Sequence, residues 1–266
     1  MLLRNVFGKT IRDLRWPTFW VALGMGGMTG YFAILFPTYK SIVDLEAILE
    51  KMGPAAKIMG ASAGDASSLV GFLHIELFSM ILPALIIAFA AGMASGFTAG
   101  EESRGTIDIL LSYPVSRRRL ILEKAVAVAL ACIFAAVAVW VMALGGAAAS
   151  SSPLPADKLA AALVMLVLLG LDFGAAALAI SAYTGNRAAS IGIAIAVMVV
   201  MYLVDALAAI IDSFNTVRPL SLFRYYMGSD PLRNGLNAGD VAVLSLVAVV
   251  FLVVGLVAFE RRDLAA

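Results

Sequence analysis

The chain has little of the chemistry that most enzyme sites need. Its 266 residues include one cysteine, Cys132, and one histidine, His74. A single cysteine excludes a disulfide framework within the chain and any cysteine-rich metal site. A single histidine excludes HExxH and other multi-histidine metal sites, and the G-x-S-x-G motif of a nucleophilic serine is also absent. The sequence therefore disfavours an enzyme.

A phosphate-binding loop is missing as well. The tripeptide Gly8-Lys9-Thr10 resembles the end of one, but that motif needs a glycine where Leu3 stands, and no strand precedes it. The chain therefore cannot hydrolyse a nucleotide by the usual route.

Charge is also scarce. Only 14% of the residues are charged, 62% are hydrophobic, and the mean hydropathy is +0.97. A soluble domain of this size covers its surface with far more charge, so the composition indicates a membrane protein. A net charge of +1 does not suggest a nucleic-acid partner.

Six apolar segments are each near or above the roughly 20 residues that a spanning helix needs. Continuous runs of this length exclude the short alternating strands of a barrel, so we expect an all-α polytopic membrane protein with a single domain, 1–266. The second and third segments are longer than needed, which predicts tilt or protrusion from the bilayer. The segments are approximately 17–37, 72–98, 120–149, 159–182, 188–211 and 241–259.

Residues 1–16 are basic and amphipathic, with apolar side chains at helical spacing and cations largely between them. This pattern predicts a helix that lies in the headgroup layer of an anionic leaflet. A signal peptide is the weaker alternative, because no small-residue cleavage site closes the next apolar run, which is long enough to span.

Lysine and arginine are unevenly divided between the connections. With the N-terminus inside, 12 lie in inner segments and 7 in outer ones, so both termini are predicted to be cytoplasmic. The outer connections 38–71 and 212–240 are long, and the second mixes aromatic residues with turn signals, which suits a partly embedded segment. The short inner link 184–187 forces the fourth and fifth helices into a tight hairpin.

Several ionisable residues fall within or beside the spans, where charge is costly and often functional. Asp172 lies near mid-membrane, and it is either a structural hydrogen-bonding group or part of a substrate path. His74 and Glu76 are either an interfacial pair or a proton or substrate contact. Asp205 lies nearer the outer end of the fifth span, as a rim residue.

Glycines also recur at four-residue spacing, which lets helix backbones approach closely. The triple in the second span is the strongest case of this pattern, although such spacings also arise by chance in a glycine-rich chain. The sets are Gly26/Gly30, Gly92/Gly96/Gly100 and Gly170/Gly174.

The stretch 100–124 is the longest charge-bearing segment between long apolar runs. Thr106 can cap a short helix with Asp108 in its first turn, where an acid suits the helix dipole. Pro114 ends that helix, and Ser116 can cap the third span. This pattern is typical of a cytoplasmic loop that a soluble partner grips.

The arginines 117–119 that follow lie at a helix N-terminus, where the dipole disfavours cations. Anionic lipid headgroups or an acidic partner surface explain them better, and Arg119 can pair with Glu123 at i, i+4. We therefore expect the stretch from Ser116 to Lys124 to anchor the third span to headgroups.

The segment resembles the motif of the type-2 ABC exporter permeases. In that motif a Gly-x-x-Glu-x-x-x-Gly-Thr-like run is followed by a Leu-Leu-x-x-Pro-Val-Ser-Arg-like run and a lysine. The basic end of the chain, 259–263, is similar to the family's C-terminal ending. The matching residues are Gly100, Glu101, Glu102, Gly105, Thr106, Leu110, Leu111, Pro114, Val115, Ser116, Arg117 and Lys124.

The resemblance implies a permease subunit that pairs with a second copy, as a homodimer or heterodimer, with a path between the two. Each copy would rest on a soluble ATP-binding subunit that holds ATP and Mg, so this chain would carry no cofactor. The coupling loop 100–118 would sit in a groove of that partner, and 212–240 would carry re-entrant gate segments. The coupling residues would be Glu101, Glu102, Arg104, Gly105, Thr106, Asp108, Leu110, Leu111, Pro114 and Arg117.

We therefore predict the permease of an exporter in the plasma (inner) membrane of a prokaryote, moving a lipid-like or amphiphilic substrate out of the cell. One alternative is an ATP-independent secondary transporter or channel in which Asp172 and Glu76 titrate. Another is a non-transporting membrane subunit of an ABC assembly.

Overall fold

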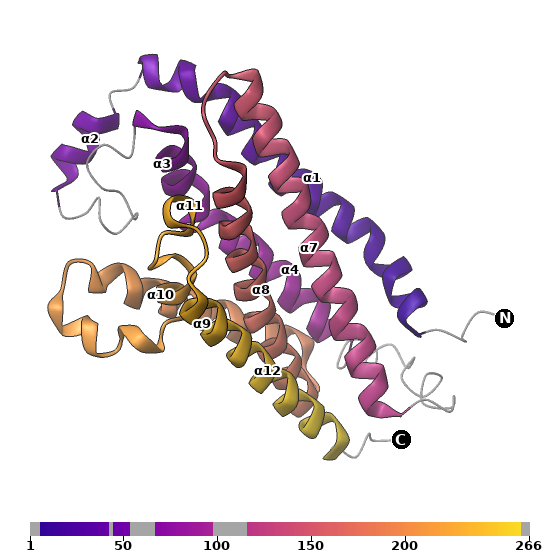
Figure 1. The fold of residues 1–266 in the computed structure, drawn as a ribbon. Coiled ribbons are helices and arrows are strands. Elements are labelled where there is room, and N and C mark those ends of the chain that lie inside the picture. Colours follow the sequence, from indigo (N-terminus) through magenta and orange to yellow (C-terminus); the bar gives the residue numbers. More distant parts are fainter. Residues whose placement is uncertain (1–5, 43–44, 54–66, 98–115, 262–266) are drawn as a thin grey trace.

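The computed structural model describes residues 6–42, 45–53, 67–97 and 116–261 (Figure 1). Within these ranges all regular structure is helical, and no strand occurs. Five helices are long and apolar enough to cross a membrane, and one bent helix pair makes up to a sixth span. These observations confirm the predicted all-α polytopic fold.

The helices fall into two sets by length. The long helices are α1 (Val6–Ile42), α4 (Ile81–Gly96), α7 (Arg117–Ala149), α8 (Ala156–Thr184), α9 (Arg187–Ala208) and α12 (Ala238–Arg261). The short helices are α2 (Leu45–Met52), α3 (Leu69–Leu73), the π-helix η3 (His74–Phe78), the 3₁₀-helices η4 (Asp212–Thr216) and η5 (Arg218–Leu220), α10 (Leu222–Met227) and α11 (Pro231–Asn234).

Local sequence signals set several helix ends. Ser116 caps α7, and its hydroxyl accepts a hydrogen bond from the Arg119 amide (3.3 Å), as predicted. Gly185 ends α8 in the left-handed conformation (φ 66°), which glycine adopts at little cost. Asn186 then caps α9 by accepting from the Ala189 amide (3.0 Å). The link between α8 and α9 is therefore as short as predicted.

Helix α1 joins the predicted interfacial helix to the first span. It runs from Val6 to Ile42 without a break and includes Pro17. A helix of this length extends about 55 Å, well beyond the roughly 30 Å hydrocarbon core of a bilayer. Its basic first turns therefore extend beyond the hydrocarbon core of the bilayer. The interfacial helix and the first span, which were expected to divide near residue 17, form one continuous helix.

The second span is bent, whereas its length had predicted tilt or protrusion. α3 and η3 together meet α4 at an angle of 43°. Pro83 lies in the first turn of α4, where its ring conflicts with helical geometry at the carbonyl four residues earlier, that of Ser79. Met80 accordingly leaves the helical conformation (φ −143°, ψ −43°).

Helix α8 lies at the centre of the bundle and contacts α4, α7, α9 and α12 (Figure 1). In its most apolar stretch 67% of the residues are buried, compared with 22% in α9 and 11% in α12. The open faces of α9 and α12 carry mostly aliphatic side chains. Such faces suit lipid or a second subunit.

Two pairs of helices, α1 with α7 and α4 with α8, cross where small residues meet. Gly26 and Gly30 of α1 face Ala138 and Met142 of α7 closely enough that an added Cβ would lie 2.8–3.0 Å from them. On α8, added Cβ atoms at the glycines 170 and 174 would lie 3.0 Å and 3.1 Å from α4 side chains. The predicted close approach is confirmed at these two pairs.

The glycine triple of the second span does not behave as predicted. Gly92 has nothing within 4 Å of an added Cβ, and Gly96 faces only the Arg187 guanidinium at 3.7 Å. Gly100 lies outside the described residues. The reason is that side chains of neighbouring helices, such as Arg187, contact this helix end, so no neighbouring backbone packs closely against these glycines.

The starts of α1 and α7 lie beside the end of α12 (Figure 1). The Phe7 amide donates to Glu123 Oε2 (3.0 Å), and Arg118 pairs with Glu260. We call this the inner end of the bundle, because the charge distribution predicts that it is cytoplasmic. The opposite end, which holds η3, α10 and α11, is the outer end.

Candidate functional site

The predicted coupling loop lies almost entirely outside the described residues. Its residues Glu101, Glu102, Arg104, Gly105, Thr106, Asp108, Leu110, Leu111 and Pro114 therefore remain a prediction. Arg117 is the first residue of α7, but its side chain also lies outside the described part. The structure does describe the two anchors of the loop, Phe97 and Ser116.

The inner end of α4, just before the loop, is bound by side chains from three other helices. Its carbonyl groups at Gly92, Ser95 and Phe97 accept hydrogen bonds, each of 3.1 Å. The last carbonyls of a helix lack partners within the helix, and cations are favourable beside them. The side-chain donors are Arg187 of α9, Ser181 of α8 and Lys124 of α7.

Lys124 contributes the contact at the very end of the helix, beside the loop. Its side chain is only 2% exposed, and Nζ lies 5.4 Å from the centre of the Phe97 ring as well as on the Phe97 carbonyl. The expectation that Lys124 anchors α7 to headgroups is therefore wrong. Helix rotation turns this position toward α4, where the ammonium group is stabilised by a carbonyl and an aromatic face.

The exposed arginines at the start of α7 pair with acids of the same chain. Arg118 forms a two-contact ion pair with Glu260 of α12, in which the NH2 group lies 3.0 Å from Oε2. Arg119 pairs with Glu123 at 2.7 Å, as predicted. Exposed pairs contribute little to stability, and the Arg118–Glu260 pair mainly links α7 to α12.

Asp172 is enclosed between α8 and α12. It is fully buried, and its nearest polar neighbour is the backbone of Ala248. Neither carboxylate oxygen has a hydrogen bond of normal geometry within the described residues. A pocket of about 210 Å³ lined by its neighbours Leu171 and Gly174 opens beside it. Burial without good partners costs stability, which favours a role beyond packing.

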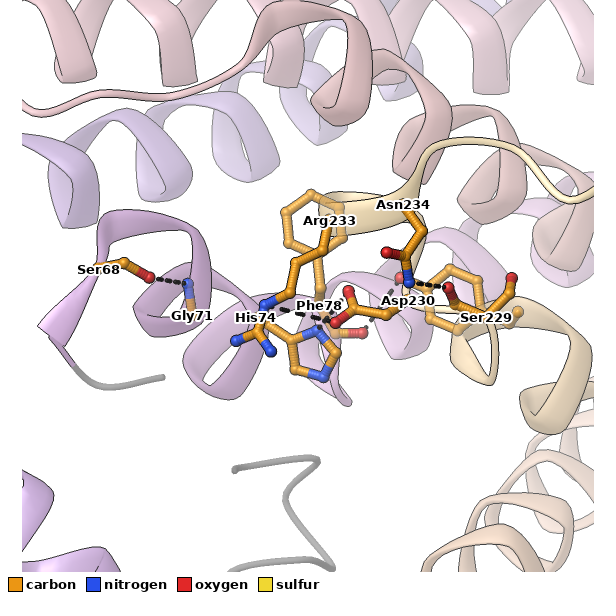
Figure 2. A network of polar contacts seen from close by, with 9 residues as sticks. Ser68, Gly71, His74, Phe78, Ser229, Asp230, Arg233 and Asn234 are labelled. Atoms are coloured by element: carbon orange, nitrogen blue, oxygen red, sulfur yellow. Dashed lines mark hydrogen bonds and ion pairs between the residues drawn. The ribbon is translucent and has the colours of Figure 1, made fainter. Parts of the chain in front are cut away.

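A second polar cluster lies at the outer end (Figure 2). Asp230 lies between His74 of η3 and Arg233 of α11, with Nδ1–Oδ1 and Nε–Oδ2 distances of 3.9 Å and 3.5 Å. Asp205 of α9 pairs with Arg218 of η5 at 2.8 Å. Glu76 is partly buried in η3. The cluster unites residues that are far apart in sequence.

Burial raises the pKa of Asp230 above its ordinary value. The positive charges of His74, when protonated, and Lys158 oppose this change, as does the amide of Arg233, but burial outweighs them. The sequence identified His74 and Asp205 as ionisable residues at the ends of spans, but it did not single out Asp230. The Asp230-Pro231 pair is recognisable as a turn signal, but no local sequence pattern indicates that it lies beside η3.

No group of three or more His, Cys, Asp or Glu side chains that could hold a metal ion occurs in the described part of the chain. The inner end of the bundle instead offers basic side chains that bind backbone carbonyls and acids. This arrangement joins the helices at the inner end.

The fold is that of a polytopic helical membrane protein whose helices are joined at the inner end by hydrogen bonds and ion pairs. The family described as "ABC-2 family transporter protein" matches residues 7–264, nearly the whole chain, and the protein belongs to this family. The resemblance read from the segment 100–124 is thereby confirmed at the family level. A comparison with curated proteins found no match.

Proposed function

We propose that this chain is the permease subunit of an ATP-driven exporter that works with a separate ATP-binding subunit. Membership of the ABC-2 family supports a membrane transport subunit and implies an ATP-binding partner in general terms. The lack of a phosphate-binding loop in the sequence places ATP and Mg on that partner. Export, rather than import, follows from the motif of the coupling loop.

The bonding at the inner end of α4 carries the proposal. Phe97 is the last described residue before the predicted coupling loop, and Ser116 is the first described residue after most of it. Lys124, Ser181 and Arg187 bind the helix end from which it leaves. If a closing ATP-binding subunit displaces the loop, α4, α7, α8 and α9 therefore move together, because packed helices joined by hydrogen bonds move as units.

Two such chains would enclose the path, as a homodimer or a heterodimer. The aliphatic open faces of α9 and α12 support contact with a second subunit or with lipid. An apolar pocket of about 620 Å³ between α7 and α8, lined by Trp140, Val164 and Leu168 among others, favours a lipid-like or amphiphilic substrate. The location would be the plasma (inner) membrane of a prokaryote.

Replacing Glu101 and Glu102 with alanine tests the coupling. We expect the amount of ATP-binding subunit that co-purifies with the permease to fall about tenfold, because interface charge pairs are costly to break. Membrane insertion and the melting temperature of the permease should stay unchanged. The matched control is Asp13→Asn, an exposed acid near the inner end on α1.

Co-purification at wild-type levels, together with normal substrate-stimulated ATPase activity, would show that the loop is only a linker. That result would contradict the proposed coupling role of the loop.

The buried carboxyl of Asp172 is the one observation that favours the ATP-independent alternative. If Asp172 lies on a substrate path, Asp172→Asn should lower transport severalfold while the melting temperature and the assembly with the partner stay the same. Vesicle transport assays with and without ATP measure the first effect. Asp157→Asn, an exposed acid in the first turn of the same helix, is the control. Unchanged transport for several substrates would assign Asp172 to helix packing.

A further inference from the structure

Two apolar cavities follow one another along α7 and α8. The cavity of about 210 Å³ beside Asp172, called the inner cavity, lies between α7, α8, α12 and the end of α4. The cavity of about 620 Å³ between α7 and α8, called the outer cavity, lies closer to the outer end of the bundle. Leu171 lines both cavities, so the two adjoin at this residue.

The α7 residues that line the two cavities share one face of the helix. Leu122, Ala125 and Ala129 line the inner cavity, and Ile133 and Trp140 line the outer one. Steps of three, four and seven residues place these side chains one above another. From the first to the last of them the face is about 27 Å long, close to the roughly 30 Å hydrocarbon core of a bilayer. The two cavities therefore extend over most of the depth of the membrane.

The inner cavity opens sideways, between α7 and α12. Leu122 of α7 and Val249 of α12 line it and are exposed, whereas Leu178 of α8 lines it and is buried. The Arg118–Glu260 ion pair joins α7 to α12 one turn nearer the inner end, so the opening begins beyond that pair. Both helices are long and apolar enough to span the membrane, so the opening faces lipid.

The size and the chemistry of the inner cavity favour a single hydrocarbon chain as its occupant. A spanning helix 10–12 Å across fills on the order of 2,500 Å³, far more than the two cavities offer. Water is also a poor occupant, because the side chains that line the cavity are apolar except for Lys124, whose ammonium binds the Phe97 carbonyl. An empty cavity forfeits dispersion contacts, and an acyl chain from the surrounding lipid restores them.

The charges at the inner end of the same face favour an anionic lipid. The helix ends 116–124 and 259–261 contain five cations and two acids. Arg119 lies three residues before Leu122, on the side of α7 that faces the inner cavity, and its side chain is 66% exposed. Its Nε binds Glu123 at 2.7 Å. A guanidinium has five N–H donors, so Arg119 can also bind a phosphate while it holds this acid.

We propose that the inner cavity binds one acyl chain of an anionic phospholipid from the leaflet at the inner end. The chain enters between α7 and α12 and continues along α8 past Leu171, and the phosphate lies on Arg119. Phe97 and Lys124 also line the cavity, so the lipid contacts the residues that anchor the predicted coupling loop. Binding needs only this chain, so the inference stands whether or not the protein exports a substrate with ATP.

Photolabelling of the purified permease in maltoside micelles tests the site. The probe is phosphatidylglycerol with a diazirine in the middle of one acyl chain, and peptide mass spectrometry locates the adducts. We expect adducts in the stretches 122–129 and 249–252, and excess unlabelled phosphatidylglycerol should suppress them. Phosphatidylcholine with the same chains should compete about fivefold less well, because it lacks the net charge that favours a lipid beside a surface cation.

Two variants separate the acyl chain from the head group. Ala129→Phe places a phenyl ring in the inner cavity and should abolish the adducts that the competitor suppresses. Ala242→Phe is the matched control, because Ala242 is exposed on α12 outside both cavities and should leave labelling unchanged. Arg119→Gln leaves the cavity open, and it should weaken competition by phosphatidylglycerol about fivefold.

Melting temperatures of the variants show whether each is folded, and Arg119→Gln tests the site even if Ala129→Phe is not. Adducts spread over the lipid-facing sides of all the long helices and insensitive to the competitor would overturn the proposal. Wild-type labelling of folded Ala129→Phe would do the same. Equal competition by the two phospholipids, or wild-type competition in Arg119→Gln, would overturn the assignment of an anionic head group to Arg119.

Discussion

Replacing Gly146 with alanine is expected to cause the largest loss of stability of any single-methyl change in α7. An added Cβ would lie 2.5 Å from the Gly30 carbonyl oxygen and 2.9 Å from the Ala33 Cβ. The first of these atoms belongs to the backbone and cannot rotate away, so α1 and α7 must separate along their contact. Overpacking in a tight core costs about 1–3 kcal/mol, and we expect the upper end of that range.

Gly145 provides the matched control for this change. It is the preceding residue of the same helix, and an added Cβ would meet nothing within 4 Å. Gly145→Ala should leave the free energy of unfolding unchanged or raise it by up to about 1 kcal/mol through better helix propensity. Denaturation in mixed micelles, followed by tryptophan fluorescence, measures both variants. Equal stability of the two would show that the α1–α7 contact can relax.

The second large effect is expected at the inner end of α4. Lys124→Met removes the buried ammonium group and leaves the Phe97 carbonyl without this donor. A hydrogen bond to a charged group contributes about 1.5–3 kcal/mol, so the melting temperature of the permease should fall. In the complex with its ATP-binding subunit, substrate-stimulated ATPase activity should fall by more than the loss of stability alone would cause. The reason is that the hydrogen bond that joins α7 to the end of α4, beside the loop, is missing.

Arg118→Met is the control for removal of a cation near the same end of α7. Its side chain is 72% exposed and pairs with Glu260 at the surface. Exposed ion pairs contribute little to stability, so this variant should melt close to the wild type and keep coupled activity. If Lys124→Met behaves in the same way, the buried ammonium is not needed to join α4 to α7.

Local sequence features predicted the individual helices well. Runs of apolar residues near bilayer length marked the spans, because lipid requires every backbone group to be satisfied within a helix. The Ser116 cap and the Arg119–Glu123 pair were also predicted, since both partners lie within one helical turn. The charged segment 100–124 indicated the family, although its own structure lies largely outside the described residues.

The contacts of the two candidate sites could not be predicted in the same way. Arg118 and Glu260 are 142 positions apart, and Tyr226 and Phe78 are 148 apart. Helices that are apolar on all sides carry no amphipathic pattern to show which face turns inward. For that reason the burial of Lys124 and the open surface at Gly92 were both missed.

The sequence by itself determined that this protein is a helical membrane permease and where some of its helices begin, such as α7 after Ser116, since these properties depend on neighbours along the chain. Only the tertiary structure decided which side chains meet. It placed Lys124 on the end of α4 and Asp230 beside His74, because helix rotation and the bend after Ser79 bring together groups that the sequence keeps apart.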